Sequence, residues 1–466
     1  FFQNDTFKVT ARVDEATNIT SGMLANEIGT DLLTAFQSIQ AFHEGGSGPF
    51  AAAMTAAQRT FLEGQLAVWE DVRSDVTTIT ARNGLWRESL NEVFAILNDA
   101  LRAPPSETEI ARELDNVETA ATSSVTGAST IKSQQWAQQL VNAVDGNSIV
   151  ASPETALAIL EELTPQITPA LVGTATHELL EGVGPKLMLT GPQAVPVETA
   201  AMVLAAAEKA APAERVAGRE VDMDDLPPLG PPGKEVSRRT IEDLGVTIVR
   251  FDNGSTLTFK PTDFEKGSVL VQLRFGHGHA GFPADQPSLA WLDGIVSASG
   301  IGDLDLDAME RLLTGRKMAM SFGVTEDALV LAGQTNGTDL ADQLRLLATK
   351  LAYPRWDESL FKRYQASGLE SYELHFASAA ARAKREFSAF SRGGDARWAA
   401  PSREAIADAT AAQFEAVFAP LLAQGPAHAI VVGDVDLDTT VEAMKASVGA
   451  LPPRQPVSVP EASLAV

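Results

Sequence analysis

The chain has 466 residues, no cysteine and a formal net charge of −25 at pH 7. Without cysteine it cannot form a disulfide scaffold, a thiolate zinc site or a cysteine nucleophile. The acidic excess argues against nucleic acid or an anionic membrane surface as a partner, and the absence of an apolar run of about 18 residues argues against a membrane-spanning helix. The sequence begins with Phe1 rather than Met, so we expect a processed chain or a part of a longer one.

Helical patterns dominate the first part of the chain. Apolar residues recur every three or four positions at 90–101, which predicts an amphipathic helix that ends at Pro104-Pro105. Ser106 and Glu109 have the spacing of a capping box, so we expect the next helix to begin there. A short apolar stretch at 186–189 predicts a strand.

A long linker is predicted at 201–240, where the composition changes. This segment contains an acidic stretch at 221–225 and the run Pro-Pro-Leu-Gly-Pro-Pro-Gly at 227–233. Proline pairs favour extended polyproline geometry and glycine frees the backbone, which is typical of a linker on a surface. We therefore expect one domain over residues 1–200 and a second over 241–456.

The second part of the chain opens with strands. Asn253-Gly254 between two apolar runs predicts a hairpin, because this dipeptide suits the tightest hairpin turns. The strands expected in this part are Val246–Phe251, 255–259, Val269–Phe275, 318–322, 328–332 and 429–432. The helices expected are 287–298, Leu306–Leu313, 340–351, 357–387 and 402–422.

The two parts share a pattern that indicates an internal duplication. The helical pattern at 90–101 followed by Pro104 matches the pattern at 340–351 followed by Pro354, and Ser152 matches Ser402 at the same offset. Several matches in one order indicate a repeated unit. The predicted fold class is therefore α/β (α+β), with two homologous mixed α/β domains. Each would be an antiparallel-rich sheet covered by helices, and the long Pro/Gly-rich linker would join them.

This organisation resembles the pitrilysin/insulinase (inverzincin) family of zinc metallopeptidases. The resemblance is best in residues 245–453, where the Asn253-Gly254 hairpin is similar to the family's domain start and the strand at 429–432 with Gly433-Asp434 is similar to its domain end. Residues 84–192 resemble the helical part of a sister domain. The resemblance implies a fold in which four such domains form two bowl-shaped halves that enclose peptides and unfolded proteins.

The family's zinc motif is absent from this sequence. That motif is His-x-x-Glu-His on a helix, in which two His bind zinc and the Glu activates water. The matching segment reads Leu-Ala-Trp-Leu-Asp-Gly-Ile at 289–295, with Trp291 near the first ligand position and Gly294 near the second. Neither residue can bind zinc. No match is found for the Arg/Tyr pair that holds the substrate carbonyl in the family, so the sequence predicts no catalytic residue.

The resemblance therefore implies a portion of a zinc endopeptidase that shapes the chamber and binds peptide substrate. Zinc and the His-x-x-Glu-His motif would be supplied by another domain or chain, and we expect no cofactor in this segment. The alternative is a catalytically inactive, peptidase-derived scaffold or peptide-binding module. The compartment stays open, with a periplasmic or secreted location slightly favoured over the cytoplasm.

Other residues offer only weak candidates for a site. His277 and His279 stand two positions apart and could form a metal pair, but no third ligand is evident nearby. The run His-Glu-Leu-Leu-Glu at 177–181 lacks a second His at a ligand spacing. Gly300-Ile301-Gly302 before a helix resembles a phosphate loop, although the acidic residues that follow favour a tight turn.

A sheet edge offers a further way to bind peptide. An exposed edge can accept a peptide as an added strand, through backbone hydrogen bonds that depend little on side chains. We hypothesise that the hairpin and third strand, within residues 246–275, supply such an edge. The competing interpretation is that helices or a partner cover every edge.

Overall fold

The computed structural model describes residues 9–12, 18–21, 85–145, 149–180, 187, 189, 194–215, 219–284 and 288–454. The chain divides into two compact units. Phe1–Pro105 and Pro169–Arg215 form the first unit, and Ser106–Thr168 and Val216–Val466 form the second. None of the described helices combines the length and the apolarity that crossing a membrane requires.

The first unit is mainly helical in its described part. Its elements are β1 (Val9–Arg12), β2 (Asn18–Ser21), α3 (Trp86–Arg102), α7 (Pro169–Leu180) and α8 (Val197–Ala207). Strands β1 and β2 pair antiparallel. The guanidinium of Arg215 donates hydrogen bonds to the Ala103 and Pro104 carbonyls and to the Asp99 carboxylate. One side chain thus satisfies carbonyls that the end of α3 leaves without helical partners.

The second unit combines helices with a seven-stranded sheet. Its helices are α4 (Glu107–Gly127), α5 (Ser133–Asp145), α6 (Pro153–Leu163), α9 (Gly294–Ala298), α10 (Leu306–Leu313), α11 (Leu340–Ala352), α12 (Glu358–Ser371), α13 (Ala379–Phe390), α14 (Arg403–Asp408), α15 (Ala411–Leu422) and α16 (Leu437–Ala446). Its strands are β3 (Glu235–Ile241), β4 (Val246–Phe251), β5 (Thr256–Pro261), β6 (Val269–Phe275), β7 (Ser321–Val324), β8 (Leu329–Thr335) and β9 (His428–Gly433). The predicted capping box of Ser106 and Glu109 starts α4.

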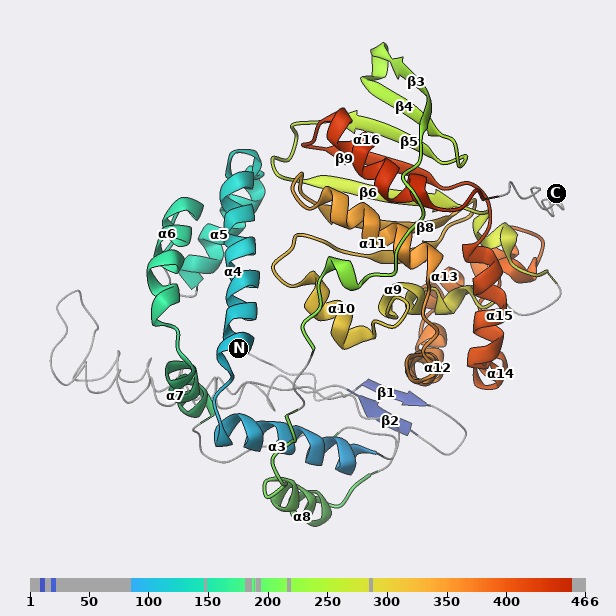
Figure 1. Ribbon diagram of the computed structural model, residues 1–466. Coiled ribbons are helices and arrows are strands. Elements are labelled where there is room, and N and C mark those ends of the chain that lie inside the picture. The colour runs from blue at the N-terminus through green and yellow to red at the C-terminus, as the bar shows by residue number, and fades with distance from the viewer. Residues whose placement is uncertain are drawn as a thin grey trace. The chain divides into compact units, whose positions relative to one another are not determined.

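The sheet is mixed, and its strand order is β3-β4-β5-β9-β6-β8-β7. Strand β9, the last of the described strands in chain order, lies between β5 and β6 (Figure 1). It runs parallel to β5 and antiparallel to β6. The other neighbours pair antiparallel. The prediction of an α/β fold with an antiparallel-rich sheet is therefore confirmed for this unit.

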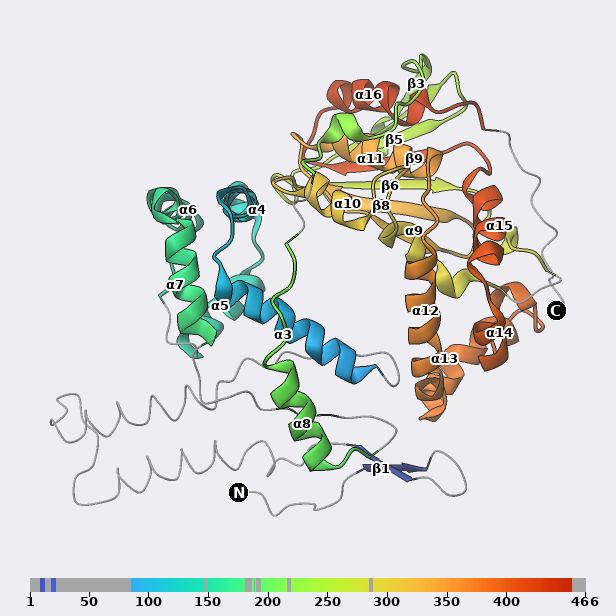
Figure 2. The ribbon, with the colours of Figure 1, turned by 60° about the horizontal axis from the view of Figure 1, so that its bottom comes forward.

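The two faces of the sheet differ in burial. Val249, Leu257, Val271 and Val431 alternate inward and are 0% exposed, and helices α11 and α16 lie side by side over this face (Figures 1 and 2). The intervening strand positions are partly or fully exposed. We call these positions the open face: Ser237, Arg239, Ile248, Arg250, Thr256, Thr258, Lys260, Leu270, Gln272, Arg274, Val330, Ala332, Gln334, His428, Ile430 and Val432.

Three predicted helices are interrupted, and each interruption has a local cause. The helix expected at 357–387 divides into α12 and α13, because the Ser378 side chain caps a new helix by accepting from Ala381 N–H. The helix expected at 402–422 divides into α14 and α15 at the capping box of Thr410 and Gln413. The helix expected at 287–298 is reduced to a 3₁₀ turn and the short α9.

The predicted linker also contains regular structure. The end of α8 and most of β3 fall within 201–240. Strand β3 has no apolar alternation because it is exposed on both faces, so its sequence does not have the usual strand pattern. The strand expected at 186–189 lies largely outside the described residues. The domain boundaries and the duplication stay predictions, although matched helices end at matched positions, α3 at Arg102 and α11 at Ala352.

A buried lysine, Lys350, lies in the last turn of α11. The Lys350 side chain is 0% exposed, and its ammonium donates three hydrogen bonds of 2.8 Å, to the Ser299 carbonyl, the Ser299 hydroxyl and the Gly300 carbonyl. Burial lowers the pKa of Lys350 to about 7 from its ordinary value of 10.5. The three acceptors compensate the ammonium for lost hydration, but no described carboxylate pairs with it.

The Lys350→Met variant should reveal this burial in the pH dependence of stability. Between pH 7 and 10.5 the unfolded chain holds more protons at Lys350 than the folded chain does, so the wild-type free energy of unfolding rises with pH. The wild type should therefore gain up to about 1.4 kcal/mol per pH unit relative to the variant. Denaturant unfolding from neutral pH to about pH 9.5 measures the difference. A difference that stays constant with pH would contradict the prediction, and Lys384→Met at an exposed site of α13 is the control.

Candidate functional site

The segment 289–295, which the sequence resemblance aligns with the family's zinc helix, packs against the core. Trp291 is partly buried against the main core, and Gly294 opens α9. A Cβ at Gly294 would lie 3.0 Å from both the Cε1 and the hydroxyl of Tyr364, so glycine allows the tyrosine ring to approach closely. An indole and a glycine supply no lone pair suited to zinc.

Asp293, between these two positions, acts on the sheet edge at β7. Its Oδ2 accepts a hydrogen bond of 3.3 Å from the backbone N–H of Val324, the last residue of β7. Burial raises the pKa of Asp293, although the backbone bonds it accepts from Val324 and Gly294 oppose the rise. The carboxylate thus already occupies part of the β7 edge.

His277 and His279 lie in the loop after β6, and the structure uses His279 for packing. The His279 ring stacks on Trp398 with the centroids 5.8 Å apart. Its Nδ1 lies 2.9 Å from the Arg397 carbonyl, and since a carbonyl can only accept, Nδ1 carries the proton. No group of three or more His, Asp or Glu in the described part of the chain could hold a metal ion. A metal role for the pair stays an untested prediction.

The other motifs singled out in the sequence have local roles. His177 is exposed near the end of α7. In the Gly300-Ile301-Gly302 turn, the Ile301 and Gly302 amides donate to the carbonyls of Leu304 and Tyr353. These amides are therefore already paired, and a bound phosphate could not use them.

The sheet edge hypothesised at 246–275 is wrong, because those strands lie inside the sheet. Strands β4, β5 and β6 each have a neighbour on both sides, and the edge strands are β3 and β7. The sequence concealed this order because β3 had the composition of a linker and because β9, far along the chain, inserts between β5 and β6. The sequence of β3, Glu-Val-Ser-Arg-Arg-Thr-Ile, has no apolar alternation that would indicate a strand.

Strand β3 has one edge that no strand in the described part of the chain pairs with. Five consecutive residues, 236–240, are exposed. The backbone N–H of Phe251 donates to Ser255 in the β4–β5 hairpin, so Phe251, Val249 and Thr247 direct their backbone groups to β5. Their partners in β3, Arg238 and Thr240, therefore direct their N–H and C=O groups outward.

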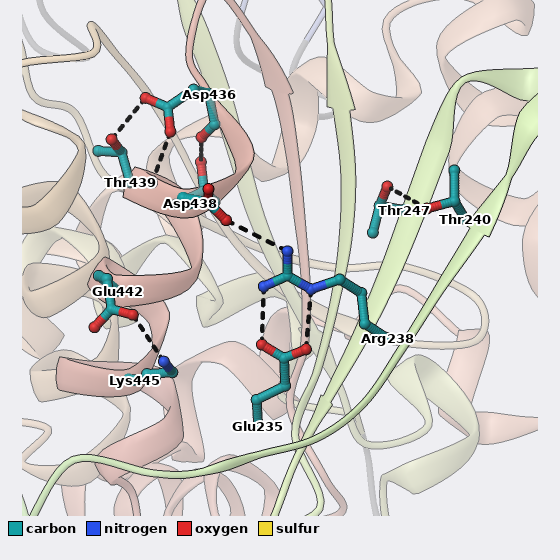
Figure 3. A network of polar contacts seen from close by, with 10 residues as sticks. Glu235, Arg238, Thr240, Thr247, Asp436, Asp438, Thr439, Glu442 and Lys445 are labelled. Atoms are coloured by element: carbon teal, nitrogen blue, oxygen red, sulfur yellow. Dashed lines mark hydrogen bonds and ion pairs between the residues drawn. The ribbon is translucent and has the colours of Figure 1, made fainter.

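Side-chain contacts hold β3 in place without covering this edge (Figure 3). Arg238 makes two bonds of 2.9 Å to the Glu235 carboxylate and one of 3.3 Å to Asp438 on α16. The hydrogen bonds from Arg238 lower the pKa of Glu235 and, in return, the pKa of Arg238 is raised. A β-bulge between Glu235 and Ser237 ends the regular ladder. The usable edge is thus short and lies between Ser237 and Ile241.

Removing the arginine anchor should loosen β3 locally. Arg238→Ala removes the contacts to Glu235 and Asp438, and since Arg238 is 37% exposed the loss of global stability should stay below about 1 kcal/mol. Hydrogen exchange at the amides of 235–241 should accelerate by more than the global change predicts. Arg239→Ala, which removes the same charge next to it but no ion pair among the described residues, is the control. Equal exchange in the two variants would contradict the anchoring role.

No protein-family model matches the chain, and no curated protein matches it. Solved structures do match. The ferredoxin protease FusC in complex with Arabidopsis ferredoxin is 16% identical with a TM-score of 0.47, over 81% of this chain and 42% of that chain. The periplasmic protease PqqL from Escherichia coli is 17% identical with a TM-score of 0.46, over 82% and 43%. An inactive domain of peptidase M16 from Pseudomonas fluorescens is 20% identical with a TM-score of 0.39, over 46% and 52%.

The chain spans about two fifths of the length of the first two of these structures, 42% and 43%. At such low identity the likeness concerns the fold alone. All three of these structures are of peptidases or peptidase domains.

Proposed function

We propose that this chain is the non-zinc-binding portion of a pitrilysin-like peptidase and that it holds peptide substrate as an added strand on β3. Another domain or chain would supply the zinc and the catalytic Glu. The sequence resemblance in 245–453 and the loss of ligands at Trp291 and Gly294 support the first part. The observation that carries the second part is the outward-facing backbone of Arg238 and Thr240.

An edge of this kind suits substrates of many sequences. Backbone N–H and C=O groups recur in every residue, so a peptide that adds to β3 would be held largely independently of its side chains. The bulge at Glu235 limits the pairing to about five residues. Arg238 is drawn back toward Glu235 and Asp438 over the helical face (Figure 3), so its side chain leaves the edge accessible.

The second edge is less suited to this role. Strand β7 has four residues, and its Val324 amide is already bound by Asp293. The backbone carbonyl of the following residue, Thr325, accepts a hydrogen bond of 2.9 Å from the backbone N–H of His279. A peptide on β7 would have to displace these contacts, whereas the outward backbone groups of Arg238 and Thr240 bond to no residue in the described part of the chain.

Thr240→Pro tests the edge directly. Proline removes the outward N–H and is tolerated at an edge position whose N–H faces solvent, so the ladder to β4 should persist. Affinity for a neutral, unstructured peptide of about ten residues should fall about tenfold or more, as measured by fluorescence anisotropy. Hydrogen exchange should show protection of 235–241 on peptide binding in the wild type but not in the variant.

Thr240→Val is the matched control, because it also loses the hydroxyl contact to Thr247 but keeps the backbone N–H. It should bind as the wild type does, and circular dichroism should show all three proteins equally folded. Wild-type affinity in Thr240→Pro, or no protection of β3 by peptide, would overturn the edge proposal.

The absence of catalysis is a separate prediction. The purified chain should retain no stoichiometric zinc after dialysis and should not cleave an unfolded protein substrate, because no described site carries the ligands. Cleavage should appear when a domain with His-x-x-Glu-His is added. Zinc bound to this chain together with cleavage would refute the prediction, and peptide binding that no zinc-bearing partner converts to cleavage would favour the inactive scaffold.

A further inference from the structure

The strands of the sheet carry a positive net charge, whereas the whole chain is acidic. The net charge is −25, yet the seven strands of the sheet contain five cationic side chains and a single carboxylate, Glu235. That carboxylate pairs with Arg238 on the helical side. The other four cations, Arg239, Arg250, Lys260 and Arg274, all lie on the open face.

Most of these cations have no local counter-charge. Arg239, Arg250 and Lys260 make no ion pair with any residue in the described part of the chain. Arg274 pairs with Asp327 at 3.0 Å, and Asp327 is 78% exposed, so solvent screens that pair. No open-face position holds an Asp or Glu. The open face is therefore a basic surface on an acidic protein.

A histidine within this surface reports the same electrostatic environment. His428 lies opposite Arg274 in the sheet register, and its Nε2 is 2.7 Å from the Thr258 hydroxyl. Burial lowers the pKa of His428, and the charge of Arg274 lowers it further. The charge of Arg274 therefore disfavours the protonated form of His428.

We infer that the open face makes this chain select acidic peptide segments among those that the β3 edge accepts. This inference rests on the proposed binding of peptide at β3. The geometry follows from the alternation of a strand, because an added strand directs every second side chain toward the open face. There those side chains would lie beside Arg239 on β3 and within reach of Arg250 on β4.

The remaining cations extend the surface inward. Arg250, Thr256, His428 and Arg274 lie in one row across β4, β5, β9 and β6, so three strand spacings, about 14 Å, separate the two arginines. Lys260 lies four residues from Thr256 along β5, in the row of Val432 on β9. A substrate that continues from the edge across the sheet would therefore meet cations throughout, while Thr and Gln side chains offer neutral hydrogen bonds between them.

Three labelled peptides of about ten residues test this selection, with Glu, Gln or Lys at every second position and the same neutral residues between them. The Glu peptide should bind the full chain at least about tenfold more tightly than the Lys peptide, with the Gln peptide between them. The advantage of the Glu peptide should shrink as salt rises from about 50 to about 300 mM. Fluorescence anisotropy gives the affinities.

The double variant Arg239→Gln/Arg250→Gln should bind the Glu and Gln peptides equally, without loss of affinity for the Gln peptide. The matched control is Lys209→Gln/Lys384→Gln, which changes the net charge by the same amount. Lys209 is exposed after α8, and Lys384 is exposed on α13. This control should keep the preference for Glu, because its lysines lie outside the open face.

Each contrary outcome has a distinct meaning. Equal binding of the three peptides would overturn the acidic selection but leave the β3 edge intact, and so would an unchanged preference in the arginine double variant. Binding of none of the three would overturn the peptide-binding proposal itself. Competition by a single-stranded oligonucleotide as strong as that by the Glu peptide would show a general anion surface and would overturn the assignment to peptides.

Discussion

The second unit depends on the insertion of β9 between β5 and β6. Residues 428–433 pair with β5, whose residues lie 172 positions earlier at Thr256, and with β6, whose residues lie 154 positions earlier at Arg274. The inward residues of β9 continue two rows of the sheet: Ala429 lies opposite Leu257, and Val431 lies opposite Val271. All four side chains are 0% exposed. Burial of apolar side chains of this kind contributes roughly 1.5–3 kcal/mol each for the larger ones. Without β9 the sheet would separate into two pieces with two further edges.

This insertion also determines where the sheet can be used. Once β9 fills the centre, only β3 and β7 remain as edges. A free edge risks pairing with other chains, and charged residues and bulges are the usual protection. Strand β3 has both, in Arg238, Arg239 and the bulge after Glu235. The same features leave a short, hydrophilic edge, which would accept a peptide in the proposed way while its charges and bulge oppose aggregation.

The sequence was sufficient for local features and insufficient for order in the sheet. Hairpin β4–β5, strand β6 and helix α10 lie where alternation, turn residues and periodicity predict them. That Trp291 and Gly294 cannot bind zinc follows from residue type alone, whereas their correspondence to the family's ligand positions stays a prediction. Strand β3 was missed since an edge exposed on both faces has no apolar period. The break at Thr410 was readable from its spacing to Gln413, but the strength of the surrounding helical pattern concealed it.

The net charge of the chain and the local charge on the open face differ in sign. A net charge of −25 describes the long-range field, which falls off within about 8 Å at physiological salt. A peptide bound at the sheet, as proposed, would therefore interact with Arg239 and Arg250 more than with distant carboxylates. The acidic remainder of the surface would repel the same peptide, so under the proposed binding the contrast between the two surfaces would favour acidic segments at the sheet. Total charge alone leaves the preferred peptides open, whereas four cations on one face would favour acidic ones.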